Sequence, residues 1–156
     1  VGARLVKKRF QALRFDNDTV EAVELLTMLH LRFHGYGEGE WTDSAVRRYV
    51  RDAGDFVTHL HVLTRADCTT RNKTKAARLS ATYDSLEARI AVLMEQEELS
   101  KIRPDLDGEQ VMQILKLKPS REVGQAMDFL MELRLEQGPI GEEAATKALL
   151  DWWASK

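Results

Sequence analysis

Residues 79–93 read LSATYDSLEARIAVL, and the large apolar side chains in this stretch recur in alternating steps of four and three. On an α-helix this spacing produces one continuous apolar seam, as in a coiled coil, formed by Leu79, Tyr83, Leu86, Ile90 and Leu93. The helical pattern extends over residues 69–102 and stops at Arg103-Pro104, because proline pushes the residue before it out of helical geometry. We therefore predict a long central helix.

Further amphipathic segments lie on both sides of this helix. The chain has no sustained alternation of period two and no Asn-Gly or Asp-Gly turn between β-branched runs, so no strand pattern competes with the helical one. We predict an all-α fold, a helical bundle with a long central helix and a smaller C-terminal helical subdomain. The predicted divisions are residues 1–78, the connecting helix 79–103 and the C-terminal subdomain 104–156.

Two of the predicted helices begin with a capping-box pattern, in which a side chain accepts backbone N–H groups that lack a partner in the first turn. Asp18 with Glu21 marks one of these starts, and Asp107 with Gln110 marks the other. The helix that opens at Asp18 is strongly apolar as far as Gly35. We therefore predict that this helix is central to the core.

The composition indicates a folded protein from a reducing compartment. Of 156 residues, 44% are apolar, which is enough for a real core, and Cys68 is the single cysteine, so no internal disulfide can form. No apolar run reaches the roughly 18 residues that a membrane-spanning helix needs. We expect a soluble, cytoplasmic protein. Because the chain opens on Val1 within a helical pattern, we also expect a piece of a longer protein.

The net charge of −2 hides an uneven distribution, with basic residues in excess over residues 1–78 and acidic residues in excess over residues 79–156. One basic cluster lies opposite the apolar side of a short helix, where we expect its guanidinium groups to stay in solvent; it consists of Arg47, Arg48 and Arg51. A second cluster consists of Arg65, Arg71, Lys73, Lys75 and Arg78. Such clusters can attract a phosphate backbone, and a solvated helix face is the alternative explanation.

Histidine and cysteine side chains offer only weak signs of a metal site or a nucleophile. His30 and His34 are one helical turn apart and could share a metal, but no third ligand is evident and the expected glutamate after the first histidine is absent. Cys68 has no plausible base nearby in the sequence. Structural roles explain all three residues more simply.

Two pairs of aspartates match the spacing of the carboxylates that hold two metal ions in polymerase-type sites. These pairs are Asp16 with Asp18 and Asp105 with Asp107. Each pair lies just before a helix, where capping explains it, and no Gly-Ser phosphate-binding turn precedes either. We therefore predict no catalytic residue in this chain.

The chain resembles the C-terminal half of bacterial CCA-adding tRNA nucleotidyltransferases, of the actinobacterial type with an internal HD domain. The resemblance rests on HLRFHGYG (30–37), WTDSAVRRYVRDAG (41–54) and especially LTRADCTTRNKTKA (63–76). It continues through RPDLDGEQVMQIL (103–115) and residues 117–153, which are similar to the family's C-terminal RNA-binding region. It therefore covers nearly the whole chain.

The resemblance implies a parent enzyme that uses CTP and ATP with Mg²⁺ to build or repair the CCA end of tRNA. In that family an N-terminal nucleotidyltransferase head, absent here, performs the reaction, so the implied partners are tRNA and the head, with neither DNA nor a membrane. Asp67 occupies the position of the closing Asp of the HD motif. The earlier histidine and His-Asp ligands of that motif are absent, and Asp67 alone cannot hold a metal.

On this resemblance, the residues expected to bind tRNA are Arg47, Arg48, Arg51, Arg71, Lys73, Lys75, Arg78 and Lys118. Lys118 stands before a helix that begins after Pro119, where free backbone N–H groups suit a phosphate. The family usually has glycine at positions 116 and 120, where this chain has Lys116 and Ser120. A close approach of the backbone to RNA at that turn is correspondingly harder.

The leading interpretation is therefore a tRNA-binding module that is inactive without the head of its parent. One rival is a truncated HD-type metal phosphohydrolase, with Asp67 as a ligand and His30 or His34 nearby. A third interpretation is a helical scaffold that binds a protein through Trp152 and Trp153.

Overall fold

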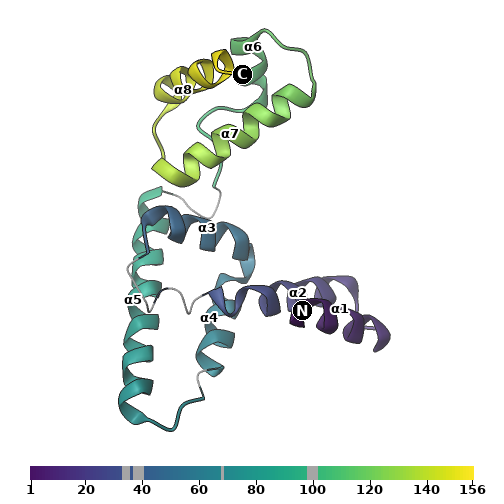
Figure 1. The fold of residues 1–156 in the computed structure, drawn as a ribbon, viewed down its shortest axis with the longest axis vertical. Coiled ribbons are helices and arrows are strands. Elements are labelled where there is room, and N and C mark those ends of the chain that lie inside the picture. The colour runs from purple at the N-terminus through teal and green to yellow at the C-terminus, as the bar shows by residue number, and fades with distance from the viewer. Residues whose placement is uncertain (33–35, 37–40, 68, 98–101) are drawn as a thin grey trace. The chain divides into compact units, whose positions relative to one another are not determined.

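The computed structural model describes residues 1–32, 36, 41–67, 69–97 and 102–156. Every element in these ranges is a helix, which confirms the predicted all-α class (Figure 1). The helices belong to two compact units. The first unit contains residues 1–42 and 49–92, and the second contains residues 43–48 and 93–156.

The first unit opens with a helical hairpin of α1 (Gly2–Ala12) and α2 (Asn17–Leu29). The carboxylate of Asp16 caps α2, since it accepts hydrogen bonds from the backbone N–H of Thr19 at 2.8 Å and from the Thr19 hydroxyl at 2.7 Å. These hydrogen bonds lower the pKa of Asp16. The prediction that Asp18 caps this helix is wrong, because Asp18 already lies in the first turn of the helix.

Helix α2 is not the centre of the core, contrary to the prediction. Only Val20 and Leu29 are buried in it, and the side chain of Met28 is largely exposed. The helix packs against α1, where Lys7 Nζ lies 2.6 Å from Glu24 Oε2, and its other apolar side chains are only partly buried. It also ends at Leu29, and the predicted end at residue 35 lies outside the described residues.

The core of the first unit lies where α3 (Asp43–Ala53), α4 (Val57–Ala66) and α5 (Lys73–Glu97) meet, with the 3₁₀ turn η2 (Gly54–Phe56) between α3 and α4. Its buried apolar residues are Tyr49, Val50, Ala53, Leu60, Tyr83, Leu86 and Ile90. The inward side of α3 consists of the buried residues Val46, Tyr49, Val50 and Ala53. Gly54, at φ +51°, follows the last residue of that helix.

The apolar seam of α5 is confirmed, because Tyr83, Leu86, Ile90 and Leu93 are all buried. The helix begins later than the predicted start at residue 69. The side-chain Oδ1 of Asn72 accepts a hydrogen bond from the backbone N–H of Lys75 at 3.1 Å, as an N-capping residue does, so the helix starts at Lys73. The predicted far end, at residues 98–102, lies mostly outside the described residues.

In the second unit, α6 (Gly108–Leu115), α7 (Arg121–Gln137) and α8 (Glu142–Ala154) pack around one apolar cluster. This cluster consists of Leu106, Val111, Ala126, Leu130, Ala145 and Leu149. Burial of each leucine in such a cluster contributes about 1.5–3 kcal/mol to stability. The capping box at the start of α6 is confirmed, because Asp107 and Gln110 exchange two side-chain hydrogen bonds with each other's backbone N–H groups, both 2.8 Å long.

The turn after α6 shows what a glycine would do at the two positions where this chain departs from the family pattern. Lys116 ends the helix in the left-handed conformation, at φ 54° and ψ 40°, which glycine adopts at lower cost. Ser120, at φ −158°, has an extended backbone that any residue can adopt. The fold therefore has a conformational use for glycine at position 116 and none at position 120.

Candidate nucleic-acid interface

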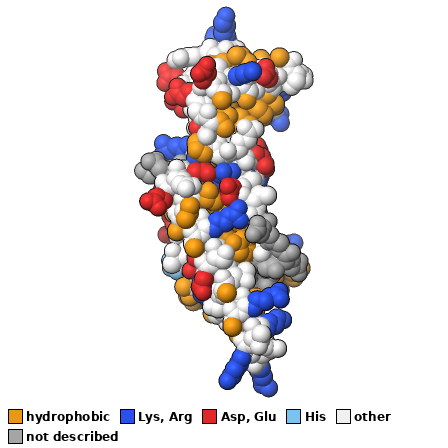
Figure 2. Space-filling model, turned by 90° about the vertical axis from the view of Figure 1, so that its left-hand side faces the viewer, with side chains coloured by type: hydrophobic (Ala, Val, Ile, Leu, Met, Phe, Trp, Pro, Cys, Tyr) orange, Lys and Arg blue, Asp and Glu red, His pale blue; other side chains and the backbone are white. Residues whose placement is uncertain are grey.

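Four basic side chains lie together at the start of α5, and we call them the basic turn: Arg71, Lys73, Lys75 and Arg78. All four are exposed. Figure 2 shows lysine and arginine side chains gathered at the bottom of the view, over the start of α5. No ion pair joins any of the four to another residue in the described part of the chain. The basic turn can therefore meet an anion from solvent.

The position of the basic turn on its helix is electrostatically unfavourable without a bound anion. A helix N-terminus carries a partial positive charge, and a cation there typically costs a few tenths of a kcal/mol up to about 1 kcal/mol. The first turn of α5 contains no acidic residue to compensate. Lysine side chains and free backbone N–H groups together make a positive site, which a phosphate would neutralise.

Arg65 belonged to the same predicted cluster, but the structure gives it another role. Its guanidinium group lies 2.7 Å from Asp84 Oδ1 and 3.0 Å from Glu87 Oε1, and it stacks over the ring of Tyr83 at 5.3 Å. These partners tie α4 to α5 and raise the pKa of Arg65. Its charge is largely compensated within the fold, which separates it from the basic turn.

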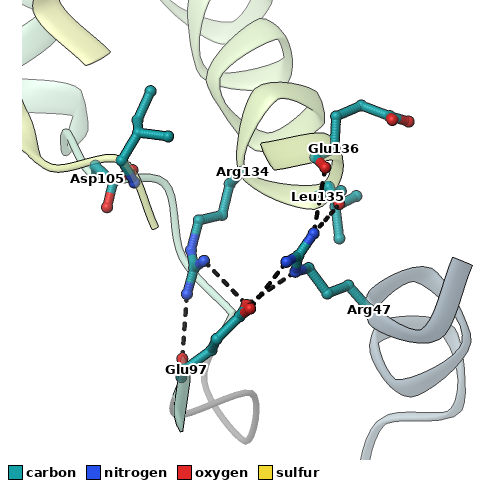
Figure 3. A network of polar contacts seen from close by, with 7 residues as sticks. Arg47, Glu97, Asp105, Arg134, Leu135 and Glu136 are labelled. Carbon is teal, nitrogen blue, oxygen red and sulfur yellow. Dashed lines mark hydrogen bonds and ion pairs between the residues drawn. The ribbon is translucent and has the colours of Figure 1, made fainter. Parts of the chain in front are cut away.

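Arg47 does not stay in solvent, so that prediction is wrong. Its side chain is only 7% exposed, and its Nε and Nη2 atoms each donate a hydrogen bond to Glu97 at 2.8 Å (Figure 3). Its Nη1 atom donates to the carbonyl groups of Leu135 and Glu136, both at 3.2 Å. Arg47 therefore caps the C-terminal end of α7, and the hydrogen bonds with Glu97 raise the pKa of Arg47.

Arg134 reaches the same carboxylate from α7. Its Nη1 atom lies 3.4 Å from Glu97 Oε2, and its Nη2 atom donates to the carbonyl oxygen of Glu97 at 3.1 Å (Figure 3). We call Arg47, Glu97 and Arg134 the arginine junction. Gly138 makes room for it, since a Cβ atom there would lie 2.9 Å from Arg47 Nη2. The hydrogen bonds and charge of Arg47 hold the pKa of Glu97 below its usual value.

The other predicted RNA-binding residues differ in their exposure and in the acidic groups near them. Arg48 is one-third exposed and pairs with Glu132 at 2.7 Å and Glu136 at 2.6 Å, which raises the pKa of Arg48. Arg51 and Lys118 are exposed. The helix after Lys118 has Glu122 in its first turn, and a carboxylate there disfavours a phosphate. The basic turn is thus the strongest candidate.

The carboxylates considered for metal binding have structural partners. Asp16 and Asp107 cap helices, and Asp105 Oδ2 accepts a hydrogen bond from the backbone N–H of Ile140 at 3.1 Å. Capping therefore explains one aspartate of each pair, Asp16 and Asp107, while Asp105 holds the backbone of Ile140 and Asp18 lies in the first turn of α2. Asp67 is exposed at the end of α4.

Of the histidine and cysteine candidates His30, His34 and Cys68, the structure describes His30 alone. The Nδ1 atom of His30 lies 2.7 Å from the carbonyl oxygen of Thr27, in line with a structural role. His34 and Cys68 lie outside the described residues. Within the described ranges, no group of three or more His, Cys, Asp or Glu side chains could hold a metal ion.

A buried aromatic pair in the first unit was not found by sequence reasoning. The rings of Tyr49 and His61 stack at 5.9 Å with an interplanar angle of 8°. Among described residues, neither the Tyr49 hydroxyl nor His61 Nε2 has a hydrogen-bond partner, although both atoms are buried. His61 Nδ1 lies 3.6 Å from Glu87 Oε1. The pattern of isolated histidines in the sequence contained no signal for this contact.

The stability of the first unit is expected to fall as pH drops below 6.5. Burial lowers the pKa of His61, against a smaller opposing effect of Glu87, so the unfolded chain binds this proton more readily than the folded one. The loss is limited to about 1.4 kcal/mol per pH unit. Thermal melts between about pH 7.5 and 5.5 should show a smaller decrease for His61→Phe, which keeps the stacked ring, than for wild type. His59→Gln, at an exposed position, should keep the wild-type decrease, and equal decreases in all three proteins would contradict the prediction.

Comparison with known proteins identifies a distant relative, the CC-adding tRNA nucleotidyltransferase of Thermus thermophilus. The two sequences are 31% identical over 157 residues, which cover 98% of this chain and 32% of the relative. The chain thus spans about a third of the relative's length. No protein-family model matches the chain, and no solved structure gives a significant match. None of the described helices is both long and apolar enough to cross a membrane.

Proposed function

We propose that this chain is a tRNA-binding region of a tRNA nucleotidyltransferase, and that the basic turn is its main contact with RNA. The observation that carries the proposal is the set of four exposed cations at the N-terminus of α5. They lie in the segment 63–76 and just beyond it, where the resemblance to the family is strongest. The similarity to the CC-adding enzyme over 98% of the chain makes tRNA a plausible ligand.

Binding through the basic turn would recognise the phosphate backbone rather than the sequence of the RNA. Lysine and arginine side chains on one helical end can each neutralise a phosphate, and the counterions released drive association at low salt. Contacts of this kind position a folded RNA by its shape and give little discrimination among bases. Arg51 and Lys118 are proposed as secondary contacts, since both are exposed.

The chemistry would belong to the part of the parent protein outside this chain. We propose that this part is a nucleotidyltransferase head that binds Mg²⁺ with CTP and ATP, and that parent and tRNA meet in the cytoplasm. The role left to the residues described here is to hold tRNA while the head acts. The HD domain and the actinobacterial type of the parent, with Asp67 as a remnant of the HD motif, stay predictions.

The isolated chain is expected not to incorporate CTP or ATP into tRNA that lacks its CCA end. In each of its aspartate pairs at least one carboxylate already binds backbone N–H groups, Asp16 in the first pair and Asp105 and Asp107 in the second, so we expect neither pair to hold two metal ions. Incubation with radiolabelled nucleotides and Mg²⁺ measures this directly. Incorporation above a control without protein would show that the chain contains a catalytic site. It would contradict the proposal that the reaction takes place in a part of the parent outside this chain.

Direct binding tests the proposal. The chain should retain tRNA on a filter at low salt and release it as salt rises, with affinity little changed by the RNA sequence. A chain that retains no tRNA at about 50 mM salt, while its circular dichroism shows the expected helix content, would contradict the proposed function.

A further inference from the structure

Exposed apolar side chains concentrate on the α1–α2 hairpin. Leu5, Leu13 and Phe15 are each about half exposed or more, and Met28 is 60% exposed. No residue of α1 is fully buried. Large apolar side chains gathered on one element of a folded protein indicate a surface that another molecule covers.

One side of this hairpin has a groove along α2. The groove has a volume of about 660 Å³ and is lined by apolar side chains of α2 together with Phe56 from η2. Acidic side chains of α2 line it as well. We call this surface the hairpin groove; it consists of Asp18, Glu21, Ala22, Glu24, Leu25, Met28 and Phe56.

The other helix of the hairpin has the complementary composition. Arg4, Leu5 and Lys8 lie on one side of α1, at the spacing of successive helical turns, and line a hollow of about 220 Å³ with Val1. We call Arg4, Leu5 and Lys8 the α1 stripe. It places basic side chains beside an apolar one, whereas the hairpin groove places acidic side chains beside apolar ones.

We propose that two copies of this chain associate hairpin to hairpin, with the α1 stripe of each copy seated in the hairpin groove of the other. Both complementary surfaces belong to the same hairpin, so a twofold axis lets one contact occur twice, as in most protein dimers. The product is a four-helix arrangement whose apolar side chains face inward. Arg4 and Lys8 of one copy would then lie near Asp18 and Glu21 of the other.

The expected dimer is weak because the surface is small. A helix of 13 residues, such as α2, is about 20 Å long, which puts a two-helix face at the low end of protein interfaces. We expect a dissociation constant of about 10–100 μM. Sedimentation equilibrium of the 156-residue chain over a concentration series should therefore show a monomer–dimer equilibrium.

Met28→Glu should weaken this dimer at least about tenfold, because it puts a charge into the apolar part of the groove. Leu150→Glu is the matched control: this leucine is 46% exposed on α8, outside the hairpin, and its replacement should leave the dissociation constant unchanged. A wild-type chain that stays monomeric at the highest concentration, or a Leu150→Glu variant affected as strongly as Met28→Glu, would overturn the proposal.

Charge reversal gives a second and independent test. One variant carries Arg4→Glu and Lys8→Glu, and another carries Asp18→Lys and Glu21→Lys. Each variant alone would set like charges against each other and should be monomeric, whereas an equimolar mixture should form a heterodimer with two restored contacts. Circular dichroism checks that both variants keep their helix content. Absence of the heterodimer in the mixture of folded variants would contradict the pairing of the α1 stripe with the groove.

Discussion

Replacing Glu97 by alanine is expected to lower the free energy of unfolding of the second unit by about 3–5 kcal/mol, because two buried guanidinium groups lose their carboxylate partner. Urea denaturation followed by tryptophan fluorescence measures this loss. A Trp41→Phe background restricts the signal to Trp152 and Trp153, which lie in α8 of the second unit. The midpoint should fall strongly in that background.

A neighbouring carboxylate provides the control for Glu97. Glu95 is exposed on the same helix, and Glu95→Ala should change stability by no more than about 0.5 kcal/mol. The effect of Glu97→Ala should also shrink as pH falls below about 4.5: the pKa of Glu97 is depressed in the folded state, so its contribution is present above that pH and is lost by protonation below it. Equal stabilities of the two variants at neutral pH would contradict the role of the arginine junction.

Local features of this fold could be predicted from the sequence because the residues that produce them are neighbours in the chain. The seam of α5 follows from spacings of three and four, and the cap of α6 from two residues three positions apart. The predicted cap of α2 was two residues too late. An aspartate at either position 16 or position 18 could cap a helix, and the sequence does not show at which of them the helix begins.

The arginine junction could not be predicted in this way. Arg47 meets a carboxylate 50 residues later and carbonyl groups of residues 135 and 136, and no periodicity links positions so far apart. On a helical projection Arg47 looks like part of a basic face together with Arg48 and Arg51. Tertiary partners changed its role from an expected RNA contact to a structural one, and they left the basic turn as the better candidate.

Removing the charges of the basic turn is expected to weaken tRNA binding on the order of a hundredfold at low salt. The variant carries alanine at positions 71, 73, 75 and 78. Alanine favours helix, so α5 should persist, and the four lost side chains make no ion pair within the described residues whose loss would destabilise the fold. The slope of log affinity against log salt should become less steep by up to about four units, roughly one for each lost phosphate contact.

A control of equal charge separates this local effect from the overall change of net charge. The residues Arg4, Lys8, Arg9 and Arg14 are also exposed and also basic, but they lie on α1 and the turn after it. Their joint replacement by alanine removes the same number of charges. It should weaken tRNA binding much less than the basic-turn variant does and change the salt slope little.

The most direct test of the proposed function is therefore a set of filter-binding titrations of tRNA with wild type, the basic-turn variant and the α1 control, from about 50 to about 200 mM salt. We expect wild type to bind with a steep salt dependence and the control nearly to retain both the affinity and the slope, whereas the basic-turn variant should lose most of both. Equal affinities and slopes for wild type and the basic-turn variant, with helix content unchanged in both, would show that tRNA does not bind at the start of α5.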